Sequence, residues 1–165
     1  MDLFNLEHLI YSICLIIYTI GFFFALRQQP SEGQKIILVI EFLGFLMMLG
    51  YWGMVQNRNA SVDELVFANK LQYISACTVY VVLLVLYLRF FQIHLPKFIY
   101  CIQLVFTVIL TIIAVTFDKH HLYYKSYHVE TINGVNTLVK EFGPFHTVFV
   151  VSVIVYTIAF TVLYL

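Results

Sequence analysis

The chain has 165 residues, of which 62% are hydrophobic and 11% charged, and its formal net charge at pH 7 is zero. This composition excludes an ordinary soluble globular domain, and without a basic cluster there is no reason to expect a nucleic-acid partner. The three cysteines are odd in number and all fall within apolar segments, so we expect them to be buried and unpaired. The sequence therefore predicts an integral membrane protein that lies in the cell membrane and crosses it several times.

Five apolar segments are long enough to cross a bilayer. They cover residues 8–26, 35–55, 64–91, 98–117 and 145–165, and together they form one transmembrane domain, 1–165. The connection at 27–34 contains Pro30 and Gly33, which break the helix. Gly21 and Ala25 in the first span have a spacing of small residues that lets a neighbouring helix approach closely. We therefore expect an all-α membrane protein with five transmembrane helices.

The second and third spans each contain an ionisable residue. Ser61 and Glu64 form a capping box that begins the third helix, and Lys70 lies about 9 Å inside that end. Glu41 lies about 9 Å inside the opposite face, near Lys35, so the two charges differ in depth by about 12 Å and a direct salt bridge is not expected. A cation at this depth needs a carbonyl, a counter-ion, water or a ligand.

Basic residues indicate how the chain is oriented in the membrane. The connections after the first and third spans carry or adjoin four of them: Arg27, Lys35, Arg89 and Lys97. The connection after the second span has only Arg58. The positive-inside rule then places the N-terminus outside, the two basic connections and the C-terminus in the cytoplasm, and residues 118–142 outside.

The long connection at 118–142 has the pattern of a β-hairpin. Its first part is rich in β-favouring residues, Asn133-Gly134 is a strong type I′ turn signal, and Thr137–Phe142 supplies the returning strand. Gly143-Pro144 ends that strand and begins the fifth helix. Because an isolated hairpin is only marginally stable in water, we expect this extracellular hairpin to rest on the outer mouth of the helices.

Three short motifs resemble a known family: LGYWGMVQ ending the second span, ANKLQY in the third, and GPFH opening the fifth after the hairpin. In this order they resemble the N-terminal seven-helix transmembrane sensor region of bacterial histidine kinases and diguanylate cyclases. The matching positions are Lys70, Tyr73 and Gly143-Pro144. Where the family commonly has a glycine after the tyrosine and then a proline, this chain has Ile74-Ser75-Ala76-Cys77. The resemblance implies a receptor region that is truncated here after five helices, as a fragment of a longer chain.

Five side chains are candidates for binding a ligand: Lys70, Tyr73, Tyr51, Glu41 and His146. Lys70, Tyr73 and Cys77 form one helical stripe that should face protein rather than lipid. Lys70 could hold an anionic ligand, form a switchable ion pair, or extend its ammonium to the outer interface. Glu41 could stay neutral, or pair with a missing helix or with Lys35 or Arg89.

The histidines suggest weaker alternatives. His8 and His146 open the first and fifth helices on the same side and could ligate a haem iron, but interfacial histidines without a metal are far commoner, so we predict no cofactor. His120, His121 and His128 lie in the outer connection, where they could bind a metal or sense pH, and we interpret them as solvated loop residues. Since no nucleophile with a base and no phosphate-binding glycine loop appears, we predict no catalytic residue.

The sequence therefore predicts the signal-sensing region of a bacterial receptor. A small ligand would enter beneath the Tyr123–Phe142 hairpin, engage Lys70, Tyr73 and Tyr51 in the outer half of the helices, and shift helix packing toward a cytoplasmic kinase or cyclase module. We expect the receptor to be a homodimer. The alternative is a small membrane transporter or channel subunit with Glu41 and Lys70 along an aqueous path.

Overall fold

The computed structural model describes residues 3–28 and 31–164. Its helices are α1 (Leu3–Arg27), α2 (Glu32–Val55), α3 (Val62–Phe90), α4 (Lys97–Val115) and α5 (Pro144–Tyr164), with a short 3₁₀ helix η1 (Phe117–Lys119) and two strands, β1 (Tyr124–Ile132) and β2 (Val135–Phe142). Two residues named in the predictions lie outside the described residues: Pro30, which was expected to break the helix in the first connection, and Leu165, the expected last residue of the fifth span. The prediction of five apolar helices and a small hairpin is confirmed.

Local signals explain where the helices begin and end. Ser61 and Glu64 form the predicted capping box, in which the Ser61 hydroxyl accepts from the Glu64 N–H. A second capping box begins α2, where the Ser31 hydroxyl accepts from the Gln34 N–H. α4 ends at Val115, so the residues after it, which were expected to complete the fourth span, turn into η1 instead.

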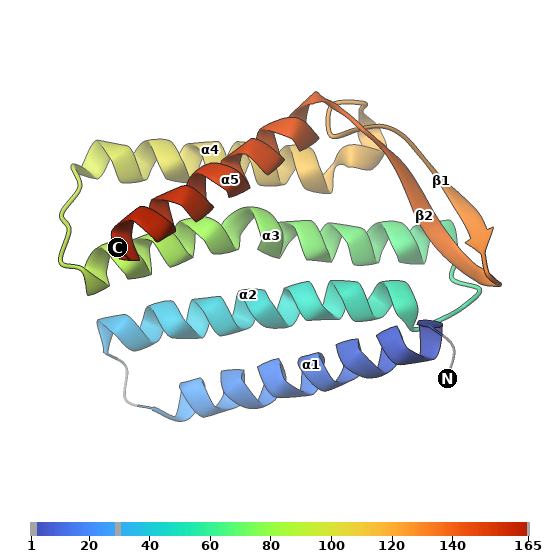
Figure 1. Ribbon diagram of the computed structural model, residues 1–165, viewed down its shortest axis with the longest axis horizontal. Helices are drawn as coiled ribbons and strands as arrows, with labels where there is room; N and C mark the ends of the chain where they lie inside the picture. The colour runs from blue at the N-terminus through green and yellow to red at the C-terminus, as the bar shows by residue number, and fades with distance from the viewer. Residues whose placement is uncertain (1–2, 29–30, 165) are drawn as a thin grey trace.

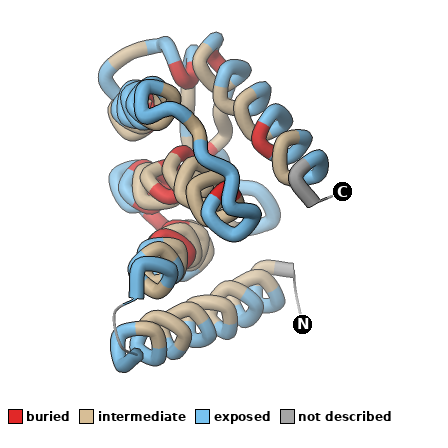
Figure 2. Tube along the Cα trace, turned by 90° about the vertical axis from the view of Figure 1, so that its left-hand side faces the viewer, coloured by how far each residue is buried: buried red, intermediate tan, exposed pale blue. Residues whose placement is uncertain are grey.

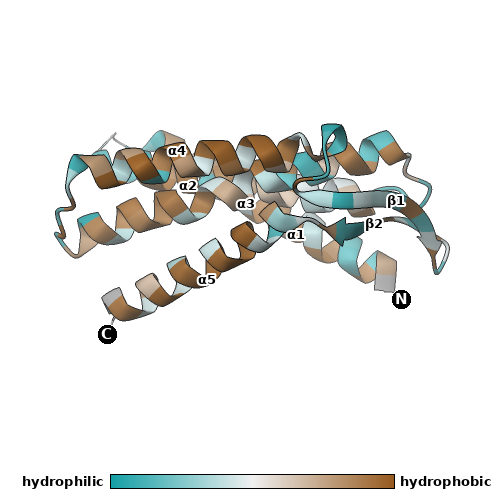
Figure 3. Ribbon diagram, turned by 90° about the horizontal axis from the view of Figure 1, so that it is seen from above, coloured by the Kyte–Doolittle hydropathy of each residue, from teal (hydrophilic) through white to brown (hydrophobic). Residues whose placement is uncertain are grey.

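The four helices α1 to α4 lie side by side in chain order, and α5 crosses over α3 and α4 (Figure 1, Figure 2). Hydrophobic residues fill the middle of the helices, whereas hydrophilic residues gather on the hairpin and in the connections (Figure 3). The protein therefore crosses the membrane several times. We call the end of the helices where the hairpin lies, and where α1, α3 and α5 begin, the hairpin end.

Glycines allow the helices to approach closely. A Cβ on Gly50 of α2 would lie 2.7 Å from both the Ala68 carbonyl oxygen and the Gln72 nitrogen of α3. On the other side of α2, a Cβ on Gly21 of α1 would lie 2.8 Å from a Glu41 carboxylate oxygen. Gly21 therefore leaves room for the Glu41 side chain, and the close helix approach expected at Gly21 and Ala25 stays a prediction.

The hairpin forms as predicted. Asn133 has φ 54° and Gly134 φ 76°, the left-handed conformations that a type I′ turn needs, and Ile132 pairs with Val135 across the turn. The backbone N–H of Asn136 donates to the Arg58 carbonyl at 2.7 Å, which ties the tip of the hairpin to the connection between α2 and α3. The expectation that the hairpin rests on the helices is confirmed.

The three cysteines are free, as expected. Cys77 is buried on α3, but Cys101 is exposed on α4, so the expectation that all three are buried was wrong. α4 has an exposed face within the described residues, and a cysteine behaves there as a small apolar side chain.

Candidate functional site

The buried core of the protein lies where the hairpin covers α3 and α4. Tyr123 and Tyr124 have exposed fractions of 0% and 1%, and Tyr73 of α3 packs edge-on against both rings. The Tyr124 hydroxyl donates to the Tyr73 hydroxyl at 2.6 Å, and burial raises the pKa of Tyr124. This pair of hydroxyls joins the third helix to the first strand inside the core.

Lys70 of α3 forms an ion pair with Asp118 of η1. The Lys70 Nζ lies 2.7 Å from Asp118 Oδ2, and the two side chains are 26% and 25% exposed. The hydrogen bond from Lys70 lowers the pKa of Asp118. The partner that Lys70 was expected to need is therefore a counter-ion in the connection that leads to the hairpin.

A second lysine was not anticipated from the sequence. Lys140 of β2 donates to the amide oxygen of Asn69, a fully buried residue of α3, and lies 5.6 Å over the Tyr124 ring. No carboxylate pairs with Lys140 within residues 3–28 and 31–164. Burial lowers the pKa of Lys140 to about 8. The structure thus holds a half-buried cation whose partners are neutral.

The alternation of inward-facing and outward-facing side chains along strand β2 is the signal that could have predicted the inward direction of Lys140. Side chains two residues apart point to the same face of a strand. Leu138 is buried in the core and Asn136 bonds to the Ala60 carbonyl, so the strand face of these two residues points toward the helices. Lys140 follows at the same spacing and therefore points inward as well.

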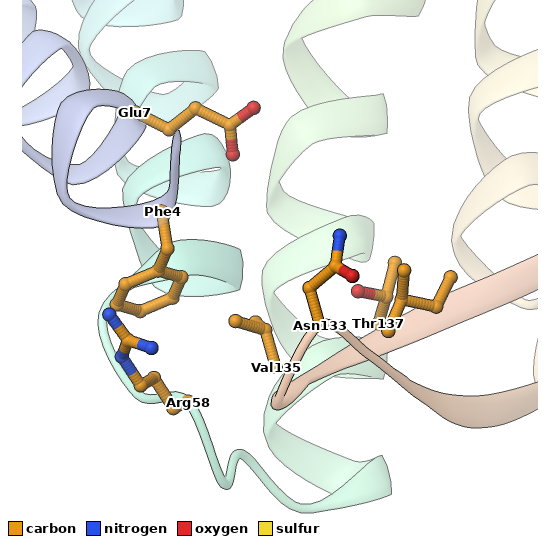
Figure 4. Close-up of a pocket in the computed structure, with 7 residues that line it drawn as sticks. Phe4, Glu7, Arg58, Asn133, Val135 and Thr137 are labelled. Atoms are coloured by element: carbon orange, nitrogen blue, oxygen red, sulfur yellow. The ribbon is translucent and has the colours of Figure 1, made fainter. Parts of the chain in front are cut away.

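A cavity of about 390 Å³ opens at the hairpin end, between α1 and the tip of the hairpin. It is lined by Phe4, Glu7, Arg58, Ile132, Asn133, Val135 and Thr137. Phe4 and Arg58 lie on one side of the opening, and Asn133 and Thr137 on the other (Figure 4). None of the five candidate residues from the sequence lines this cavity.

The chain is similar to a known family of membrane proteins. A family described as the N-terminal 7TM region of histidine kinase matches residues 8–165. The chain belongs to this family. It is a transmembrane sensor region of the histidine kinase type, as the sequence motifs predicted, and five of its candidate membrane helices lie within the described residues. No curated protein and no solved structure matches the chain.

The sensor region brings three of the five candidate side chains to the hairpin end. Lys70 meets the connection, and Tyr73 meets Tyr123, whose ring also contacts His146 of α5 at 5.5 Å. His146 stacks on Phe142 at the end of β2, with ring centroids 3.9 Å apart. Lys70, Tyr73 and His146 therefore all contact the hairpin or the segment leading into it.

The other two candidates lie between α1 and α2. Tyr51 stacks on Tyr11 of α1 with ring centroids 5.3 Å apart, and Glu41 lies against Gly21. Lys35 and Arg89 were considered as partners of Glu41, but both bond to Glu32, at 2.8 Å and 3.3 Å. That possible pairing was wrong, because an exposed carboxylate at the start of α2 is within easier reach of both cations.

The histidines of the sensor region do not share a site. His8 lies on α1 beside Trp52, at one end of the row of helices, whereas His146 lies on α5, which crosses over α3 and α4 (Figure 1). The alternative that His8 and His146 of one chain hold a haem iron is therefore wrong. In the hairpin and the segment before it, His121 Nδ1 bonds to the Lys125 carbonyl and His128 to Glu130. Within the described residues, no group of three or more possible ligands could hold a metal ion.

Proposed function

We propose that this sensor region binds a small ligand at its hairpin end and relays a helix rearrangement to a cytoplasmic kinase or cyclase module of a bacterial receptor in the cell membrane. One observation carries this proposal. Three neighbouring side chains of α3 bond to the hairpin or the segment before it: Asn69 to Lys140, Lys70 to Asp118 and Tyr73 to Tyr124. A ligand that moves the hairpin would therefore move α3.

The same helix reaches the other end of the protein. α3 runs without interruption to Phe90, and Arg89 in its last turn bonds to Glu32 at the start of α2. A continuous helix moves as a stiff rod, so a shift at one end is passed to the other. A ligand changes the helix arrangement only when it binds the two arrangements with different affinities.

Each candidate residue has a part in this mechanism. Lys70 and Asp118 form the ion pair that holds the segment before the hairpin on α3, so a ligand that moves this segment would disturb the pair, and Tyr73 and His146 hold the hairpin core. Tyr51 and Glu41 lie at the contact of α1 with α2, where they would respond when α1 shifts. We further propose that the receptor functions as a homodimer.

Replacing Lys70 with methionine should abolish the response of the full-length receptor and leave membrane insertion intact. Methionine keeps the length of the side chain but cannot pair with Asp118, so the connection before the hairpin loses its bond to α3. The measurement is a transcriptional reporter read across growth media that change the wild-type output, together with the amount of protein in the membrane fraction. Lys35→Met is the matched control, because the Lys35 side chain is 61% exposed at the opposite end. An unchanged response of Lys70→Met would exclude this mechanism.

The proposed orientation places the hairpin outside the cell. A single cysteine at Lys125 of β1 should then react with a membrane-impermeant maleimide in intact cells, whereas one at Gln92, between α3 and α4, should react only after permeabilisation. Both side chains are exposed, so a difference in their labelling would report the side of the membrane and not their burial in the protein. The background variant lacks Cys14, Cys77 and Cys101. The reverse labelling pattern would invert the topology and place the ligand site in the cytoplasm.

The alternative function as a transporter or channel subunit requires Glu41 and Lys70 to share a path. In the structure Glu41 lies against α1, whereas Lys70 bonds to the connection after α4, so the two side chains belong to different helix contacts. This arrangement favours the sensor. Ion flux through vesicles reconstituted with the pure protein would favour the alternative.

A further inference from the structure

We propose that the cavity between α1 and the tip of the hairpin binds a small zwitterion with an apolar side chain, the class to which free aliphatic amino acids belong. This inference rests on the proposed function, because it names the class of ligand that the sensor region recognises. It assigns recognition to Glu7, Arg58 and the hairpin tip rather than to the membrane-embedded residues that the sequence pointed to.

Charges of opposite sign line the cavity. Glu7 is half-buried, and its carboxylate takes part in none of the ion pairs that the structure shows within residues 3–28 and 31–164. The Arg58 guanidinium lies 4.6 Å over the Phe4 ring and donates to the Asn5 side-chain oxygen. Because a guanidinium carries five N–H donors, it can also donate hydrogen bonds to a carboxylate. A zwitterion would place its ammonium at Glu7 and add its carboxylate to the existing partners of Arg58.

The remaining lining suits an apolar side chain. Phe4, Ile132 and Val135 supply hydrocarbon surface, while Asn133 and Thr137 add polar groups on the hairpin side (Figure 4). The volume of about 390 Å³ falls within the range of roughly 300 to 1,000 Å³ that small-molecule sites occupy. A bare inorganic ion would leave most of this space and its apolar surface unused.

The hairpin tip and the connection that carries Arg58, which form one side of the cavity, are held together without the ligand. The N–H of Asn136 bonds to the Arg58 carbonyl, so the hairpin tip and the arginine keep their relative positions. Preformed walls lower the ordering cost of binding. α1 packs mainly on α2, and a zwitterion in the cavity would join its first turns to the hairpin. Binding would therefore change how α1 is held.

The only tryptophan of the chain offers a direct readout. Trp52 of α2 donates from its indole N–H to the Ser12 hydroxyl of α1 at 3.2 Å, and its ring lies 6.2 Å from that of His8, the residue after Glu7. Its fluorescence should report any change in the packing of α1 on α2 near the cavity.

The experiment titrates the purified chain in lipid nanodiscs with three probes of similar shape: leucine, 3-methylbutylamine, which lacks the carboxylate, and 4-methylpentanoate, which lacks the ammonium. Leucine should produce a saturable change in Trp52 fluorescence, and both analogues should bind at least about tenfold more weakly, since each loses one charged contact. Glu7→Gln should weaken leucine binding by about tenfold or more. Glu32→Gln, an exposed carboxylate at the opposite end, is the matched control and should bind leucine normally.

Two results would overturn the proposed ligand class. One is the absence of a saturable change with leucine, isoleucine, methionine and phenylalanine, and the other is equal binding of leucine and 3-methylbutylamine. If the response of the receptor still depends on Lys70 in either case, the sensor function stands and only the ligand class fails. If leucine binds through Glu7 but never alters the receptor output, the site stands and the relay fails.

Discussion

Replacing Gly50 with alanine is expected to lower the free energy of unfolding by about 2 kcal/mol or more. The added Cβ would lie 2.7 Å from two backbone atoms of α3, the Ala68 oxygen and the Gln72 nitrogen. Backbone atoms in a helix cannot move aside singly, so α2 and α3 must separate along their contact. The measurement is equilibrium unfolding in mixed detergent micelles followed by circular dichroism.

Gly33→Ala is the matched control for this experiment. Gly33 also lies on α2, but a Cβ there would meet nothing within 4 Å. Because alanine favours a helix more than glycine does, this variant should be as stable as the wild type or slightly more stable. If Gly50→Ala were equally harmless, the close contact of α2 with α3 would not describe the folded protein.

Raising the pH from about 7 to about 9.5 is expected to stabilise the docking of the hairpin by about 2 kcal/mol through Lys140. Burial lowers the pKa of Lys140 from 10.5 to about 8 in the folded protein. Between these two values the unfolded chain binds a proton that the folded chain has released, so stability rises with pH. Below about pH 8 the charged ammonium is held in a partly buried site whose partners are neutral, and this lowers stability. The measurement is hydrogen exchange of the β2 amides as a function of pH.

The groups around Lys140 do not add a pH dependence of their own to the stability in this pH range. Asn69 is neutral, and burial raises the pKa of Tyr124, so its hydroxyl stays protonated throughout. His146 lies near enough to be influenced by the lysine charge, but an ordinary imidazole loses its proton below this range. Lys140→Met should therefore remove the rise in stability, whereas Lys125→Met should keep it, because Lys125 is 61% exposed. A rise that persists in Lys140→Met would assign it to another group.

Local patterns were sufficient for most of the fold. The capping box at Ser61 and the turn at Asn133-Gly134 were found where they were predicted, because each depends on residues that are adjacent or nearly so in the chain. The apolar runs located the helices to within a few residues. The largest difference is at the start of α1, which begins at Leu3 rather than at residue 8, and the fourth helix stops at Val115 although hydrophobicity continues after it.

The partners of the polar groups could not be predicted in the same way. The sequence indicated that Lys70 needs a counter-ion or ligand, but nothing local pointed to Asp118. The alternation of β2 would have turned Lys140 toward the helices, yet its meeting with Asn69 depends on how the hairpin lies across α3. The cavity at Glu7 and Arg58 draws on three distant segments and has no signature in any of them.

The amino-acid sequence by itself determined the membrane class, the number of apolar helices, the hairpin and the family. Within a bilayer each segment must satisfy its own backbone hydrogen bonds, so composition and length suffice to identify a helix. Only the tertiary structure decided which charges meet, where the cavity opens and which helix is joined to the hairpin. These contacts connect residues far apart in the chain, and their distances depend on how whole helices pack against one another.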